Sequence, residues 1–156
     1  VVERFHAGKP TALGAASGLV AGLVIITPAA GFVEPSSAVI MGLIGGVVCY
    51  GGVLLKGKVG YDDSLDAFGI HGLGGAVGAI LTGLFLAPAL NDDVAGSFGY
   101  AGRQALELGI TAVYAVVITV VLLKVLDATM GLRVSEDDER DGLDGHLHGE
   151  AGYALD

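Results

Sequence analysis

Long stretches without a charged residue alternate with short polar segments along this chain. Three of them are uninterrupted: Thr11–Val33, Pro35–Leu55 and Ala67–Asn91. A fourth, Leu108–Leu123, reaches a similar length if it begins near Gln104. At about 1.5 Å per helical residue, each of these can cross a hydrocarbon core of about 30 Å. The pattern predicts four transmembrane helices, at about 11–28, 36–55, 65–87 and 98–128.

The composition agrees with a protein that is embedded in lipid. Of the 156 residues, 53% are hydrophobic and only 16% are charged, with a mean hydropathy of +0.69. Because about a quarter of the residues of a soluble protein are charged, we expect an all-α membrane protein. Cys49 is the single cysteine, which excludes an intrachain disulfide and a cysteine metal site. We expect no cofactor, no metal and no nucleic-acid partner. Since the chain starts with Val1, we also expect it to be a piece of a longer protein.

Basic residues are distributed unevenly between the two ends of the predicted helices. Seven of the eight fall on one side: Arg4, Lys9, Lys56, Lys58, Lys124, Arg133 and Arg140. Loops rich in Lys and Arg face the cytoplasm, so we expect a multi-pass protein of the cell membrane. It would have a cytoplasmic connection at 1–10, a membrane domain at 11–131 and an acidic, cytoplasmic C-terminal tail at 132–156.

Glycines recur at every fourth position in three of the predicted helices. They are Gly14, Gly18 and Gly22, then Gly42 and Gly46, then Gly74 and Gly78. Such faces let helix backbones approach closely in lipid. We expect these glycines to pack helices together and to do no chemistry.

A few polar side chains lie inside the apolar stretches. His71 falls about two turns into the third predicted helix, and an intramembrane histidine is a functional candidate by default. Burial disfavours imidazolium, so we expect the neutral ring, which has one donor and one acceptor nitrogen. The alternative is a histidine bonded to the backbone of a neighbouring helix. Asp66 is expected to cap the free N–H groups at the start of that helix. For Thr27 and Ser17, a hydroxyl bonded to its own helix is favoured over a pore contact.

Three stretches in this order carry a resemblance to a known family. They are TPAAGFV at Thr27–Val33, KVGYDDSLDAFGIHG at Lys58–Gly72, and the segment Gly131–Glu150. Together they resemble the Amt/MEP/Rh ammonium transporters, in the bacterial and archaeal Amt branch. The resemblance implies an ammonium transporter fold of about eleven transmembrane helices with inverted repeats. The chain would supply the last four of these helices and the cytoplasmic tail.

The resemblance also implies a function and a site. His71 matches the second of two histidines that meet in a narrow hydrophobic pore for ammonium or ammonia, with methylammonium as an analogue. Its partner histidine would lie on a helix that this chain does not contain. Thr27 and Ser17 are the other candidate pore residues.

Further implications concern assembly and regulation. The resemblance implies a homotrimer whose tail packs against neighbouring subunits and takes part in regulation by PII signalling proteins. The tail residues that match the family include Arg133, Glu139, Arg140, Asp144, His148 and Glu150. A metal site over His146–Glu150 is disfavoured, because only one of its two histidines matches the family pattern.

Two other function classes compete with a transporter. The chain could be an ammonium sensor that signals through its tail, and the sequence leaves this alternative open. A membrane-embedded hydrolase using Asp66 and His71 is disfavoured, because no nucleophile or second metal ligand accompanies His71. We therefore expect a transporter and not an enzyme.

Overall fold

A computed structural model describes residues 1–152 of the chain. Residues 153–156, the end of the predicted acidic tail, lie outside the described residues. The chain separates into two compact units, Val1–Thr111 and a second that begins at Ala112. Within residues 1–152 every regular element is a helix. Four helical segments are long and apolar enough to cross a membrane. This confirms the predicted fold class.

The four segments differ from the predicted ranges mainly at their ends. The third begins at Phe68, so His71 lies in its first turn and not two turns in as predicted. The first combines α2 (Ala12–Ile26) with a 3-10 turn at Thr27–Ala29, and the second is α3 (Pro35–Val59). The third combines a π turn, η2 (Phe68–Gly72), with α4 (Leu73–Phe85). The fourth, α5 (Phe98–Met130), passes from the first unit into the second.

Helix α3 runs four residues past its predicted end at Leu55. Lys56 and Lys58 lie in its last turn, where cations are favourable because of the helix dipole. Gly60 then ends the helix in the left-handed region, with φ +75°. Glycine adopts this conformation without the steric cost of a Cβ.

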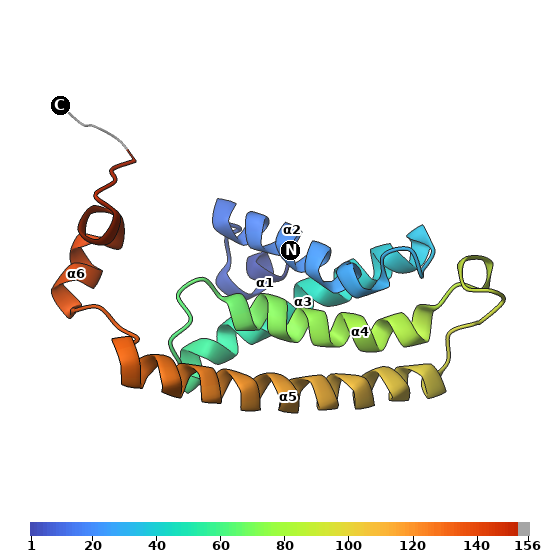
Figure 1. The fold of residues 1–156 in the computed structure, drawn as a ribbon. Helices are drawn as coiled ribbons and strands as arrows, with labels where there is room; N and C mark the ends of the chain where they lie inside the picture. Colours follow the sequence, from blue (N-terminus) through green and yellow to red (C-terminus); the bar gives the residue numbers. More distant parts are fainter. Residues whose placement is uncertain (153–156) are drawn as a thin grey trace. The chain divides into compact units, whose positions relative to one another are not determined.

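In the first unit α2, α3 and α4 pack side by side (Figure 1). Two clusters of buried side chains lie between them. One contains Ile25, Ala29, Val33 and Met41, and the other contains Ala21, Cys49 and Ile70. Because one cluster joins α2 to α3 and the other joins both helices to the π turn, the third apolar segment is fixed against the first two.

Only some of the regularly spaced glycines make close contacts in this chain. A Cβ built on Gly74 would lie 2.9 Å from the sulfur of Cys49, so the backbone needs glycine there. In α3, however, Gly42 and Gly46 face open space, and Gly45 makes the close approach to α2. Within this chain the spacing therefore located the contact face of α4, whereas Gly18 and Gly22 of α2 face open space like Gly42 and Gly46 of α3.

The predicted cytoplasmic connection contains a short helix, α1 (Val2–Ala7). The carboxylate of Glu3 accepts hydrogen bonds from the backbone N–H and the hydroxyl of Thr11, at 2.9 and 2.8 Å. These two bonds lower the pKa of Glu3. Thr11 also caps α2, since its hydroxyl accepts from the N–H of Gly14 at 2.9 Å. The segment before α2 is thus tied to the start of that helix.

The second unit holds the remainder of α5 and two short helices, α6 (Glu136–Asp141) and a π turn, η4 (Asp144–His148). Ser135 caps α6 by accepting from the N–H of Asp138 at 3.1 Å. His146 lies 3.2 Å from a carboxylate oxygen of Asp138. An acidic composition alone suggests disorder, but residues 135–148 are largely helical here.

Candidate functional site

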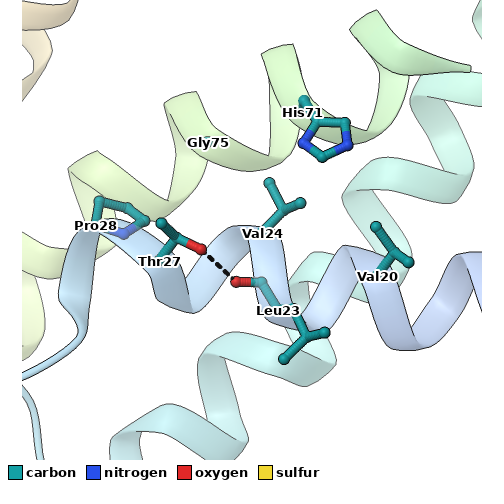
Figure 2. Close-up of a pocket in the computed structure, with 7 residues that line it drawn as sticks. All are labelled: Val20, Leu23, Val24, Thr27, Pro28, His71 and Gly75. Atoms are coloured by element: carbon teal, nitrogen blue, oxygen red, sulfur yellow. Dashed lines mark hydrogen bonds between the residues drawn. The ribbon is translucent and has the colours of Figure 1, made fainter.

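His71 lies on the π turn and faces a groove between that turn and α2 (Figure 2). The groove has a volume of about 460 Å³. Its lining is Val20, Leu23, Val24, Thr27, Pro28, His71 and Gly75. The imidazole is exposed in this chain, although the residues before it, Gly69 and Ile70, are buried. The backbone of the π turn is therefore fixed in the core while the ring projects outward.

The groove is apolar except for two side chains, those of His71 and Thr27. The Thr27 hydroxyl donates to the Leu23 carbonyl oxygen at 2.6 Å (Figure 2), so it is bonded to its own helix as favoured above. Within residues 1–152 no hydrogen bond to the His71 ring is found. The alternative of a histidine bonded to a neighbouring backbone is therefore not what the structure has.

The π turn is a feature that hydropathy could not reveal. The N–H of Leu73 reaches back to the carbonyl of Phe68, five positions earlier, so this turn accommodates one extra residue. The sequence feature that accompanies this π turn is a pair of glycines, Gly69 and Gly72, on either side of Ile70 and His71. Single π turns occur frequently at functional sites, which agrees with the position of His71 within this one.

The prediction that Asp66 caps this helix is wrong. The carboxylate of Asp63 accepts instead, from the N–H of Ala67 at 2.8 Å and of Phe68 at 2.9 Å. Asp66 has a left-handed backbone with φ 57°, and its carboxylate pairs with the ammonium group of Lys56. The carboxylate of Asp66 is therefore engaged by α3 and not by the free N–H groups at the start of the π turn.

Ser17, the third predicted pore residue, does not share the groove of His71. It lines a separate cavity of about 620 Å³ bounded by α1, α2 and α3. Asp66 also lines that second cavity. The structure thus brings Thr27 to His71 and leaves Ser17 on another face of α2.

The predicted tail residues make contacts within the second unit. The guanidinium of Arg133 lies 4.0 Å from the carboxylate of Glu139. The N–H of Glu150 donates to the carbonyl of Asp144 at 3.0 Å, which closes the η4 turn that contains His148. Arg140 lies 3.9 Å from Glu136, within α6.

Comparison with known proteins places these features in a family. Residues 1–153 match the model of the Ammonium Transporter Family. The chain belongs to the ammonium transporter family. This confirms the family that the three sequence stretches indicated.

Relatives from bacteria and archaea have similar sequences. The chain is 48% identical over 159 residues to an ammonium transporter of Bacillus subtilis, covering 98% of this chain and 39% of that protein. It is 42% identical to the ammonium transporter Amt1 of Archaeoglobus fulgidus, covering 94% of this chain and 38% of that protein. The chain therefore spans about two fifths of the length of these family members.

Solved structures of family members share the fold. The crystal structure of Saccharomyces cerevisiae Mep2 matches with a TM-score of 0.79 and 37% identity, covering 87% of this chain and 33% of that chain. Candida albicans Mep2 matches with a TM-score of 0.73 and 32% identity, covering 88% of this chain and 33% of that one.

Proposed function

We propose that this chain is the C-terminal part of an ammonium transporter and lines one side of its pathway with His71. The observation that carries the proposal is an imidazole that has no hydrogen-bond partner among residues 1–152 and lies on an apolar groove of a family member. The chain spans only about two fifths of its relatives. The second histidine and the opposite wall of a narrow pore would come from the part of the protein that precedes this chain.

The chemistry of the groove suits a small polar solute better than an ion with its water shell. Moving a bare ammonium ion from water into hydrocarbon costs about several kcal/mol of free energy, even after the surrounding protein and water have adjusted to the charge. A neutral imidazole offers one donor and one acceptor nitrogen. The two ring nitrogens of His71 can exchange hydrogen bonds with ammonia or ammonium in place of the water that the solute leaves behind. Because Thr27 is already bonded to Leu23, His71 is the principal polar group of this wall.

The orientation and the assembly belong to the same proposal. The basic residues favour a multi-pass protein of the cell membrane with its tail in the cytoplasm. By the resemblance, the proposal includes a homotrimer with one pathway per subunit. It also includes a tail that contacts a PII regulatory protein.

The pathway assignment is tested by changing His71→Ala in the full-length protein, reconstituted into liposomes. The rate of methylammonium uptake should fall about tenfold or more. Removing the imidazole from a narrow site should reduce the rate at least as much as displacing it would. His6→Ala is the control, because His6 lies outside the groove and bonds to Tyr50 at 3.0 Å. Unchanged uptake by a well-expressed His71→Ala protein would reject the pathway assignment.

The sensor alternative is decided by the same preparation. A sensor would bind methylammonium with a measurable affinity while the liposomes accumulate none. Uptake by the unmodified protein that is proportional to protein content would exclude a pure sensor.

A further inference from the structure

One face of α3 meets the whole segment that carries His71. Cys49, Gly52 and Lys56 are spaced three and four residues apart, so they lie on one side of the helix on successive turns. Each of them contacts a different part of the chain between residues 63 and 74. We call these three residues the α3 clamp.

Lys56 holds the loop that precedes the π turn. Its ammonium group donates to the carbonyl oxygen of Asp63 at 2.8 Å and pairs with the carboxylate of Asp66. The carbonyl oxygen of Asp66 in turn accepts the N–H of Ile70 at 2.9 Å. Lys56 is thus connected to Ile70, the residue before His71, through Asp66 and one backbone hydrogen bond.

Gly52 allows the backbones of α3 and the π turn to touch. A Cβ built on Gly52 would lie 3.0 Å from both the Cα and the carbonyl oxygen of Gly69. A Cβ built on Gly69 would lie 3.0 Å from the backbone nitrogen of Val53. The nearest atom to the Gly52 Cβ would be Cδ1 of Leu73 at 2.7 Å, in a side chain that can rotate. The atoms of Gly69 and Val53 belong to the backbone and cannot move aside without moving a helix. The neighbouring glycine, Gly51, has no atom within 4 Å of its built Cβ.

Cys49 holds the far side of the π turn. Its side chain is 2% exposed, and its thiol donates to the carbonyl oxygen of Ile70 across 3.5 Å. The sulfur fills the space that Gly74 leaves open, 2.9 Å from the Cβ built there. The bond is weak, but it acts on the carbonyl of the residue immediately before His71.

We propose that the α3 clamp positions the His71 ring, with Cys49 and Gly52 as positioning residues for transport. A π turn holds one residue more than a regular helical turn. If it relaxed to a regular helix, the residues on one side would shift in phase by about 100° around the axis. The clamp contacts residues on both sides of His71 and so holds the ring toward the groove. This inference rests on the proposed function, because it concerns the orientation of the His71 side chain, the proposed pathway residue.

A matched pair of glycine variants tests the clamp in the full-length protein. Gly52→Ala and Gly51→Ala change neighbouring positions of the same helix in the same way, so their effects on helix propensity are equal. Gly52→Ala should lower the maximal rate of methylammonium uptake into liposomes about tenfold, the scale expected for a displacement of less than 1 Å. Its KM should stay within about twofold, since Gly52 is not among the residues that line the groove. Gly51→Ala should match the unmodified protein in both quantities.

A second pair of variants, at Cys49, tests the clamp if the Gly52→Ala protein does not fold into a monodisperse sample. Cys49→Ala removes the thiol donor and should lower the maximal rate, whereas Cys49→Ser keeps a donor and should restore most of it. Equal maximal rates for Cys49→Ala, Cys49→Ser and the unmodified protein would overturn the positioning role of Cys49. A folded Gly52→Ala protein with the unmodified maximal rate would overturn that of Gly52.

His71→Ala, measured in the same liposomes, separates this inference from the proposed function. If His71→Ala reduces uptake and the clamp variants do not, His71 stays in the pathway and only the clamp is rejected. If His71→Ala leaves uptake unchanged, the pathway assignment itself fails, and with it the clamp.

Discussion

Two aspartates in the loop before the π turn make different contacts, although their side chains are chemically identical. Asp63 and Asp66 are the same residue type, three positions apart, and either could cap a helix. Asp63 does so, while Asp66 is held by Lys56. The two residues also differ in their backbone, since that of Asp66 is left-handed with φ 57°. A backbone angle of this kind depends on the fold around it and is not readable from residue type.

Changing Asp63→Ala should destabilise the protein, because two backbone N–H groups lose their acceptor. Loss of a capping side chain costs about 1 kcal/mol in the free energy of unfolding. The measurement is the thermal unfolding midpoint of the purified protein in detergent. Ser64→Ala is the matched control, since Ser64 is exposed and adjacent. Equal midpoints for the two variants would show that the cap does not contribute.

At the scale of elements, the helices follow from local composition and their contacts do not. The uncharged runs predict the four apolar segments within a few residues, because crossing hydrocarbon requires a long stretch without charge. The glycine spacing identified Gly74 and Gly78 correctly but selected Gly42 and Gly46 where Gly45 makes the contact. All of these glycines fit a close-packing pattern. Which of them is used depends on how each helix is rotated about its axis.

Gly78→Ala should separate α4 from α2. The added Cβ would lie 3.0 Å from Cγ of Pro28 and 3.1 Å from the carbonyl carbon of Ile25. Overpacking of this kind costs about 1–3 kcal/mol in the free energy of unfolding. Gly75→Ala, in the same helix, has no atom within 4 Å of the added Cβ and should melt like the unmodified protein. If both variants melt alike, the close approach at Gly78 is not important for stability.

At the scale of the whole molecule, much of the apolar surface of the chain stays uncovered. The most apolar part of α5 has 0% of its residues buried, and large side chains of α2 and α3 such as Leu13 and Leu43 are exposed. A soluble protein rarely exposes apolar surface on this scale. Lipid and the remaining three fifths of a family member are the surroundings that suit it.

Deleting the tail from Ser135 onward should leave membrane insertion intact. All four candidate spans end at or before Met130, so none of them loses a residue. The deletion should abolish binding of a PII protein, because the proposed contact surface is removed. Membrane fractionation followed by co-sedimentation with purified PII protein measures both effects. Undiminished PII binding by the truncated protein would contradict the proposed role of the tail.

The sequence by itself determined the membrane class, the four long apolar helices and the family, and it proposed His71 as the candidate pathway residue. Each of these rests on contiguous residues, either as an uncharged run or as a motif such as GIHG. Only the tertiary structure decided that His71 sits on a π turn and that Cys49, Gly52 and Lys56 lie beneath it. Those features depend on backbone angles and on how closely distant segments approach. Both are set when helices pack against one another and not by any short stretch of the chain.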